Sequence, residues 1–437
     1  MSQPPRVPPD LSRPPRTDPP ARTDPPPPPA AGCPFHGGAV RRSQPAEPTG
    51  PGGGARRSRP PTPNVPGGPV ELRSLAAGRQ VLRAGDAARQ DGFGIREAAR
   101  SPVKLKPPVL WQDGEEHKRQ RTAIAHFFTP MAAKERYRPL MERLADELVA
   151  EVERDGRAEL SGLAMRMAVG VAAQVVGLTD SRRPGMHARI DAFIAHGAAK
   201  PSWDPRELLR FVRLQKAVAD YFRVDVKPAI DARRRSPQDD VISHLIAQGR
   251  NDQDILIEAI TYGAAGMVTT REFIAMAAWH LLTDAGLLAR YRAGDEAERH
   301  ALLAEVIRLE PVVGRLFRRL EGDVELAGGE TLTAGSRVVI DVRAANADAA
   351  AVGPHPYCLD PDRRVAAKGV QRYGLAFGDG QHRCPGSFLA LEEADVFLSR
   401  LLALPGVSLE GEPELRFNDL VQGYEVRDMW VAAGRER

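Results

Sequence analysis

Apolar residues recur at helical spacing along most of the chain from about residue 69 onward. Alanine, leucine, arginine and glutamate fill these segments, a composition that favours helices. The spacing predicts helices over residues 72–84, 115–128, 131–154, 158–177, 185–197, 205–232, 238–248 and 296–309. A longer segment, residues 252–282, is apolar around much of its circumference, as expected for a helix that runs through a core.

Shorter alternating stretches lie toward the C-terminus. Val324 to Leu326 and residues 336–340 flank a glycine pair and resemble a hairpin, and residues 414–433 also resemble strands. A last helix is expected from about Pro385 to Leu402. The pattern therefore predicts a mainly α fold with small β-sheets, in a single domain over residues 69–437.

Residues 1–68 differ from the rest of the chain in composition. They hold 21 of the 39 prolines, together with nine arginines and four acidic residues. Such a segment buries too little apolar surface to offset its ordering entropy, so we expect a disordered tail. The remaining 369 residues carry 52 basic and 53 acidic groups. Because this part is nearly neutral, a nucleic-acid-binding groove is not expected.

Membrane and secretory signals are not apparent in the sequence. No apolar run approaches the roughly 18 residues of a membrane span, and no apolar targeting region follows the N-terminus. The three cysteines, Cys33, Cys358 and Cys384, are too few and too scattered for a disulfide framework. We therefore expect a cytoplasmic protein without a membrane span.

The segment 377–386, with the sequence FGDGQHRCPG, is the most informative for chemistry. Its glycines allow a tightly folded backbone that a flat ligand can approach closely. Cys384 precedes Pro385, which suits the first position of a helix, and a helix N-terminus stabilises a thiolate. This arrangement favours a sulfur ligand for iron, whereas a lone Cys-Pro-Gly would be interpreted as a buried cysteine at a turn.

Six positions of this segment together resemble the cysteine loop of the cytochrome P450 family of haem-thiolate monooxygenases. They are Phe377, Gly378, Gly380, His382, Cys384 and Gly386. The resemblance extends over about residues 70–437 and implies haem b as the cofactor, with Cys384 as the axial ligand of its iron. It also implies that Phe377, Gly378, His382 and Gly386 belong to the cofactor site.

Further motifs follow the order of this family. By resemblance, Glu305 and Arg308 on one helical face form a buried charge network with Arg363, which has a structural role. His117 and Arg121, one helical turn apart, resemble residues that hold haem propionates. Arg318 matches a further residue that binds a propionate, and His382 adds another hydrogen-bond donor. For each of these four positions taken singly, a solvent-exposed cation is the alternative.

The segment 264–270 resembles the oxygen-binding part of the central helix of the family. The resemblance implies catalytic roles for Ala265, Gly266 and Thr269, the last in proton delivery. A threonine bonded back to its own helix is the alternative. The chain departs from the family at Val268, where an acid is usual. It also has the tail in place of an N-terminal helix and two strands, which could trim the edge of the large sheet and open the substrate entrance.

The resemblance implies a monooxygenase that inserts one oxygen atom from O2 into a largely apolar or aromatic small molecule, or couples such molecules oxidatively. A ferredoxin- or flavodoxin-type protein would supply electrons, with Lys118, Arg119 and Arg383 as a docking patch. Val268 leaves open a peroxide-driven enzyme, and a haem-thiolate protein that only binds ligands is a third possibility. A non-haem helical scaffold would require the cysteine loop to be a coincidence. The expected pocket, mostly apolar, draws on residues 103–110, 193–211, 263–268, 311–314 and 422–424.

Overall fold

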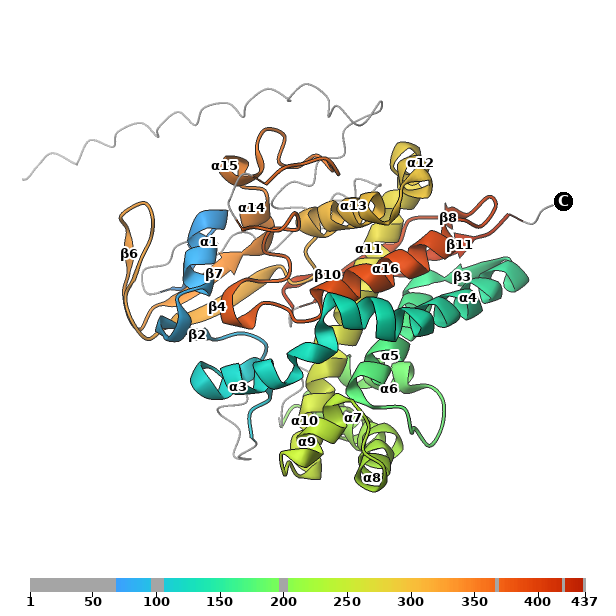
Figure 1. Ribbon diagram of the computed structural model, residues 1–437, viewed down its shortest axis with the longest axis horizontal. Helices are drawn as coiled ribbons and strands as arrows, with labels where there is room; N and C mark the ends of the chain where they lie inside the picture. Colours follow the sequence, from blue (N-terminus) through green and yellow to red (C-terminus); the bar gives the residue numbers. More distant parts are fainter. Residues whose placement is uncertain (1–67, 96–105, 196–202, 366–368, 419–420, 435–437) are drawn as a thin grey trace, which may run out of the picture. The chain divides into compact units, whose positions relative to one another are not determined.

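The computed structural model describes residues 68–95, 106–195, 203–365, 369–418 and 421–434 (Figure 1). These residues belong to the second of two compact units of the chain, residues 33–437. The tail predicted over residues 1–68 lies outside the described residues except for its last position. The domain boundary near residue 69 therefore stays a prediction.

Most described residues are helical, as the sequence predicted. The helices are α1 Leu75–Leu82, α3 Gly114–Ile124, α4 Arg138–Asp155, α5 Leu160–Val176, α6 Met186–Ile194, α7 Pro205–Tyr221, α8 Lys227–Arg235, α9 Val241–Ala247, α10 Asp252–Tyr262, α11 Thr269–Thr283, α12 Ala285–Ala293, α13 Glu296–Leu309, α14 Val342–Asn346, α15 Ala349–Val352 and α16 Ser387–Leu401. Helix α12 was not predicted. Helix α13 begins with a capping box in which Asp295 and Glu298 satisfy each other's backbone N–H groups.

The central segment predicted as one long helix is confirmed, with an irregular middle. Helices α10 and α11 are joined by a π-helical turn over Gly263–Val268 (Figure 1). Nearly all of the first three turns of α11 are buried, which explains why its sequence shows little amphipathic pattern. The helix packs against α5 and α16 in the main hydrophobic core.

A four-stranded sheet stands beside the helical part, in the order β1-β7-β4-β2. Its strands are β1 Val70–Leu72, β7 Arg337–Asp341, β4 Arg315–Leu320 and β2 Ala88–Gln90. Strand β1 is parallel to β7, and the other pairs are antiparallel. Strand β4 was not predicted, because its alternation of arginine with apolar residues is short. Within the described residues β1 and β2 are the two edge strands, and the expected trimming of the sheet edge stays a prediction.

Three smaller sheets complete the β-structure of the described residues. Strand β5 Val324–Glu325 pairs with β6 Thr331–Leu332. The predicted hairpin is therefore wrong in its second strand, because residues 337–341 form β7 of the four-stranded sheet. Strand β9 Glu414–Asn418 pairs with β10 Gly423–Arg427. Strand β11 Trp430–Ala432 lies between β3 Arg157–Glu159 and β8 Ser408–Glu410. The helix predicted from residue 158 therefore begins two residues later, after β3.

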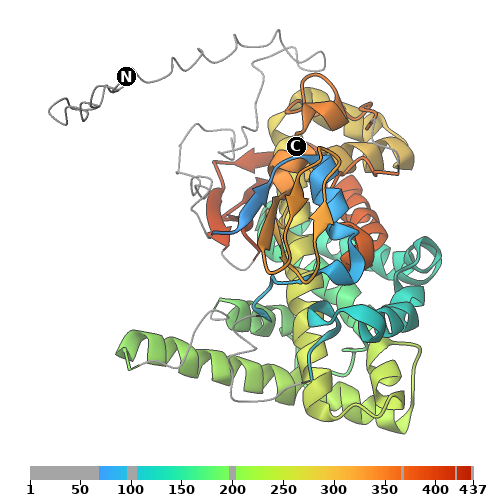
Figure 2. The same ribbon diagram turned by 90° about the vertical axis from the view of Figure 1, so that its left-hand side faces the viewer.

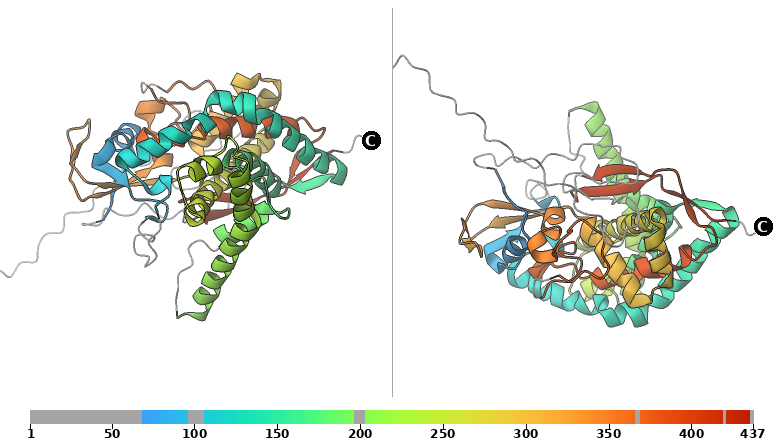
Figure 3. Two further views of the ribbon diagram at one scale, coloured as in Figure 1. Left: turned by 60° about the horizontal axis from the view of Figure 1, so that its bottom comes forward. Right: turned by 90° about the horizontal axis from the view of Figure 1, so that it is seen from above.

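Helix α7 extends away from the other helices (Figures 2 and 3). Its last residue, Tyr221, is fully buried, whereas most of its N-terminal half is exposed. Across the described part of the chain, no helix is both long and apolar enough to cross a membrane.

Candidate functional site

One cavity of about 2310 Å³ brings together the residues that the sequence assigned to cofactor binding and catalysis. Its lining includes Cys384, His117, Arg121, Arg318, His382, Phe377, Gly378, Gly386, Ala265, Gly266 and Thr269. These residues come from α3, β4, α10–α11 and the loop before α16. The volume exceeds the roughly 300–1000 Å³ of an ordinary small-molecule site, so the cavity has room for a cofactor and a substrate together.

The cysteine loop is a tight turn held by its own backbone. The N–H of Cys384 donates to the carbonyl of Phe377 at 2.8 Å, and the N–H of Gly378 donates to Leu375 at 2.8 Å. Gly380 has φ +66°, and a Cβ at this position would lie 2.0 Å from the carbonyl oxygen of Leu82. Only glycine therefore permits this close approach between the loop and the end of α1.

The sulfur of Cys384 receives a hydrogen bond from the N–H of Gly386. Helix α16 begins at Ser387 with Gly386 as its N-cap, so the prediction that Pro385 opens the helix is wrong by two residues. Burial raises the pKa of the Cys384 thiol, against the lowering effects of the Gly386 N–H, Arg121 and Arg383. The helix N-terminus alone therefore does not hold an anionic sulfur, whereas a coordinated metal cation would.

Four basic side chains converge beside this loop. The rings of His117 and His382 stack with their centroids 4.2 Å apart, and Nε2 of His382 lies 2.9 Å from a carboxylate oxygen of Asp113. Arg318 donates to the side-chain oxygen of Gln90 at 2.7 Å, and Arg121 donates to the carbonyl of Arg383. Asp113 therefore orients His382, and Gln90 orients Arg318. Neither Asp113 nor Gln90 was singled out from the sequence.

The electrostatics of this group favour the binding of an anion. Burial, followed by the charges of His382 and Arg121, lowers the pKa of His117 to about 4. Burial also lowers the pKa of Arg318 to about 10. Nδ1 of His117 is buried without a hydrogen-bond partner. A ligand with carboxylates would satisfy this atom and relieve the mutual repulsion, so the residues fit the propionates of a haem.

The predicted charge network of Glu305, Arg308 and Arg363 is present and buried. Arg308 binds both carboxylate oxygens of Glu305 at 2.6 and 2.7 Å, and Nε of Arg363 binds the same carboxylate at 2.7 Å. The remaining donors of the two arginines reach backbone carbonyls of residues 346–358. The network therefore fixes the path of the long loop that leads to Cys384.

Another cavity-lining residue, Thr269, begins α11 directly after the π-helical turn. Its hydroxyl donates to the carbonyl of Ala265 at 2.8 Å, so the back-bonded alternative is the arrangement observed. The hydroxyl oxygen retains acceptor capacity toward the cavity. A Cβ at Gly266 would meet no atom within 4 Å, which leaves space beside the helix. Val268 is 5% exposed, belongs to the core and does not line the cavity.

The rest of the cavity wall follows the predicted segments in part. Residues of those segments that line the cavity include Val109, Leu110, Phe193, Phe211, Ala264, Val312, Val313 and Gln422. Residues 103–105 lie outside the described part of the chain. The wall is more polar than expected, because Asp191, Arg271 and Arg427 also contribute. Arg271 pairs with Asp191 at 2.5 Å, and Arg427 pairs with Glu272 at 2.8 Å, so these charges balance one another.

The docking patch expected from the sequence is less strongly positive than its residues suggest. Lys118 and Arg119 are 75% and 74% exposed, but they pair with Glu115 and Glu116 on the same helix. Arg383 is half-buried and donates to the hydroxyl of Tyr373 at 2.7 Å. Phe388, four residues after Cys384, is 47% exposed and adds an apolar element that sequence reasoning missed.

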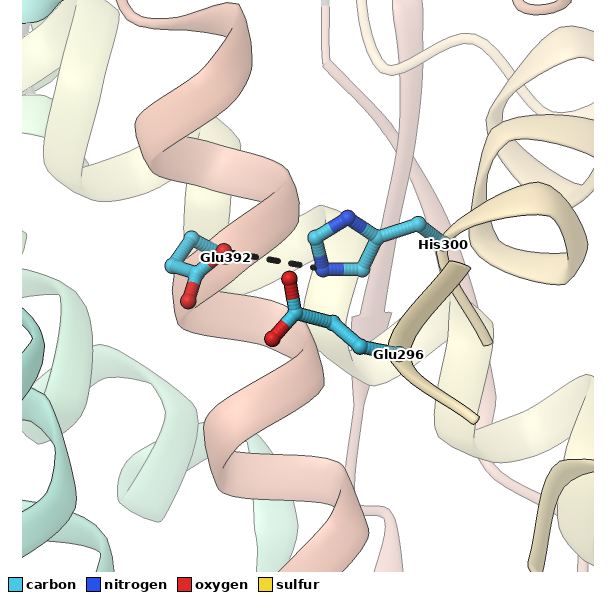
Figure 4. A group of neighbouring side chains, drawn as sticks. All are labelled: Glu296, His300 and Glu392. Carbon is cyan, nitrogen blue, oxygen red and sulfur yellow. Dashed lines mark ion pairs between the residues drawn. The ribbon is translucent and has the colours of Figure 1, made fainter. Parts of the chain in front are cut away.

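A second cluster of metal-binding residue types lies outside this cavity. Glu296, His300 and Glu392 face one another between α13 and α16 (Figure 4). Lys134 binds Glu296 at 2.6 Å, and Arg138 binds both glutamates. Because these two cations already neutralise the two carboxylates, we assign the cluster to helix packing.

Comparisons with known proteins agree with this geometry. The family model named Cytochrome P450 matches residues 300–419. Nocardicin C N-oxygenase of Nocardia uniformis subsp. tsuyamanensis is 30% identical over 346 residues, which cover 77% of this chain and 82% of that protein. Mycinamicin IV hydroxylase/epoxidase of Micromonospora griseorubida is also 30% identical, with the same coverage.

Solved structures show the same fold. CYP164A2 of Mycobacterium smegmatis, in its ligand-free state, has a TM-score of 0.65 and 28% identity, covering 84% of this chain and 93% of that structure. CYP109E1 of Bacillus megaterium, in complex with corticosterone, has a TM-score of 0.66 and 24% identity, covering 83% and 92%. Their coverage extends well beyond the segment that the family model matches.

Proposed function

The chain belongs to the cytochrome P450 family, whose members are haem-dependent oxidoreductases, and we propose that it is a monooxygenase acting on a small-molecule metabolite. In this proposal it inserts one oxygen atom from O2 into the substrate, or couples substrates oxidatively, with electrons from a ferredoxin- or flavodoxin-type protein. The observation that carries the proposal is the shared cavity, which is lined by a cysteine, four basic side chains and Thr269.

The cofactor we propose is haem b, with Cys384 as the ligand of its iron. His117, Arg121, Arg318 and His382 would hold the propionates, and Phe377, Gly378 and Gly386 would contact the ring from the cysteine side. When bound, this cofactor supplies the oxidising chemistry, and a thiolate ligand favours cleavage of the O–O bond. The protein contributes binding, orientation and the control of water and protons.

Thr269, Gly266 and Ala265 are the proposed catalytic residues. The bond from Thr269 to the carbonyl of Ala265 fixes the hydroxyl, so that its oxygen faces the cavity as a hydrogen-bond acceptor. The π-helical turn and the absence of a side chain at Gly266 leave space for a water molecule beside it. We infer that Thr269 holds such a water and passes protons from it.

Replacing Thr269 with alanine is expected to lower the product formed per reducing equivalent consumed by about tenfold or more, the scale of one lost proton-transfer group. Serine at this position restores the hydroxyl and should retain most of the coupling. The matched control is Thr261→Ala, because Thr261 lines the same cavity and is bonded back to Ile257 in the same way. Equal coupling in both alanine variants would remove Thr269 from the proton path.

For the substrate we propose a largely apolar or aromatic molecule with a polar part. Apolar side chains such as Phe193, Phe211 and Leu316 form much of the wall, and paired charges at Asp191 and Arg271 lie at one side of it. The two relatives are named for an N-oxygenation and for a hydroxylation or epoxidation. A screen of such metabolites by the shift of the Soret absorption band tests this substrate class.

A peroxide-driven reaction is the second candidate, favoured by Val268. The residue is apolar and buried, so it neither carries a proton nor orients a water in the cavity. Turnover with hydrogen peroxide is compared with turnover by a reductase–ferredoxin pair on the same substrate. If product forms faster with peroxide, peroxide takes the place of O2 as the proposed oxidant. If no product forms in a single turnover, only a ligand-binding role is left.

Electron transfer should depend on the surface near the cysteine loop. We expect Arg119→Glu combined with Phe388→Ser to slow the first reduction by a ferredoxin about tenfold and to weaken its dependence on salt, because an exposed charge mainly sets the association rate. Both side chains are exposed, so the fold should be unaffected. Arg154→Glu is the control, since Arg154 is an exposed arginine elsewhere. An unchanged rate and salt slope in the double variant would place the docking site on another face.

A further inference from the structure

One arginine of the cavity wall has a nitrogen that no described residue engages. Arg271, two residues after Thr269 on α11, lines the cavity and is 5% exposed. Its Nε donates to Glu272 at 2.7 Å, and its Nη1 donates to Asp191 at 2.5 Å. A guanidinium carries five N–H donors, and within the described part of the chain Nη2 has no acceptor. Because a buried donor without a partner costs free energy, this nitrogen is suited to an acceptor on a bound ligand.

Asp191 on α6 offers the complementary atom. It also lines the cavity, and its side chain is 44% exposed. One carboxylate oxygen, Oδ1, accepts from Arg271, whereas Oδ2 accepts from no described residue. Because the bond between Nη1 and Oδ1 joins the two side chains, a free donor and a free acceptor belong to one charge-assisted pair. A ligand group that accepts and donates through neighbouring atoms can therefore use both side chains.

The charges around this pair disfavour a ligand that is itself an anion. Glu272 also binds Arg427 at 2.8 Å, and Arg427 binds Glu425 at 2.9 Å. The cluster of Asp191, Arg271, Glu272, Glu425 and Arg427 thus holds two cations and three carboxylates. Burial raises the pKa of Glu272, and the charge of Glu425 adds to this rise against the two arginines. A substrate carboxylate would bring a fourth anion into the cluster.

The other arginines of the wall are paired as well. Apart from the four basic side chains of the proposed haem site, each cavity-lining arginine among the described residues has a carboxylate partner. The further pairs are Arg210 with Glu207, Arg337 with Asp91, and Arg416 with Glu414. The substrate side of the described cavity therefore offers no unpaired cation to an anionic substrate, and a neutral polar group suits it better.

We propose that Arg271 and Asp191 together recognise a carboxamide or lactam group of the substrate. Nη2 of Arg271 donates to the carbonyl oxygen of this group, and Oδ2 of Asp191 accepts from its N–H. The inference rests on the proposed function and deepens it, because it names the polar part of a largely apolar substrate. A carboxamide is neutral and carries an acceptor and a donor on adjacent atoms, whereas an ester lacks the donor. A site built around such partners discriminates against analogues that lack one of them.

The test uses ligands of similar size that lose one polar group at a time. N-benzyloctanamide has the carbonyl and the N–H, benzyl octanoate has only the carbonyl, and benzyl octyl ether has neither. Isothermal titration calorimetry on the full-length holoprotein measures their dissociation constants. The ratio of ester to amide reports the N–H, and the ratio of ether to ester reports the carbonyl. In the wild type we expect each ratio to be about tenfold, the scale of a hydrogen bond to a charged group.

Two variants assign the ratios to residues. Asp191→Ala should bring the ratio of ester to amide close to one, and Arg271→Met should do the same for the ratio of ether to ester. The Asp191 side chain is partly exposed, so its alanine variant tests the proposal even if Arg271→Met does not fold. Arg210→Met is the control, because Arg210 lines the cavity but pairs with Glu207. A residue needed only for packing would weaken all three ligands equally and leave both ratios unchanged.

The proposal is overturned if the wild type binds the ester as tightly as the amide, or if Asp191→Ala keeps the ratio of ester to amide. It is also overturned if ω-phenylnonanoate, a carboxylate of similar size, binds the wild type as tightly as the amide, which would indicate an anion site.

A failure of the proposed function gives a different result. If both ratios are found but no ligand shifts the Soret band or forms product, the recognition stands and the monooxygenase proposal fails. If the ligands are oxidised without any preference for the amide, the monooxygenase proposal stands and the recognition fails.

Discussion

Replacing Cys384 with serine is expected to abolish the absorption band that is diagnostic of a sulfur-ligated ferrous haem with carbon monoxide, and to reduce product formation at least about a thousandfold. The sulfur lies in the same cavity as the four basic side chains, and the N–H of Gly386 donates to it. A serine hydroxyl fits the same turn but is a much weaker acid than a thiol, so it does not provide the anionic sulfur ligand that donates electron density to iron. The measurement is the difference spectrum of the dithionite-reduced protein with and without carbon monoxide.

Cys358→Ser is the matched control for this experiment. Cys358 is a buried cysteine, 8% exposed, in the loop region that Arg308 and Arg363 hold through backbone carbonyls. This variant should retain the spectrum of the wild type. A thiolate-type spectrum in Cys384→Ser, or its loss in Cys358→Ser alone, would overturn the assignment of the iron ligand.

Replacing Arg308 with lysine is expected to lower the free energy of unfolding by about 3–5 kcal/mol, the cost of breaking a buried ion pair from one side. Arg308 is fully buried, and its guanidinium binds Glu305 through two nitrogens and also the carbonyls of Asn346, Pro356 and Cys358. An ammonium group keeps the charge but not this planar set of donors, so the loss comes from buried acceptors left without a donor, at about 1–3 kcal/mol each. Urea unfolding followed by circular dichroism measures the change.

The control for the network is Arg290→Lys. Arg290 pairs with Asp362 at 2.8 Å, with side chains 34% and 61% exposed, so the substitution should change stability by less than about 1 kcal/mol. The network also predicts that Arg308→Lys loses haem more readily on dilution, because the loop leading to Cys384 depends on it. A loss of stability in Arg308→Lys as small as that of the control would mean that the buried pairs are not needed to hold this loop.

Local patterns predicted the helical framework because helices depend on contacts between near neighbours. Helix α13 has the bounds that the sequence indicated, and the central α10–α11 segment was identified by its unbroken apolar surface. Strand β4 was missed because its stability depends on pairing with β7 and β2, which lie far away in the sequence. The π-helical turn was missed as well, because a single wide turn leaves no trace in hydrophobic periodicity.

The difference between contacts of near neighbours and contacts of distant residues also applies to the site. The cysteine loop is contiguous, so its chemistry could be recognised from ten residues. The partners of the basic cluster could not, because Asp113 meets His382 across 269 residues and Gln90 meets Arg318 across 228. The polar part of the cavity wall likewise depends on Asp191 and Arg271, which are 80 residues apart. The structure therefore adds the groups that orient the residues named by the sequence.

The π-helical turn at Gly263–Val268 has a consequence for the winding of the whole central helix. A π turn holds one residue more than an α turn, so the parts of the helix on either side are out of phase by about 100° compared with a continuous α-helix. Deleting one residue within this turn would restore regular winding and rotate Tyr262 and everything before it relative to Thr269. Length within this turn is thus under a stricter constraint than side-chain identity, since a substitution alters one contact whereas a deletion reorients every contact of α10.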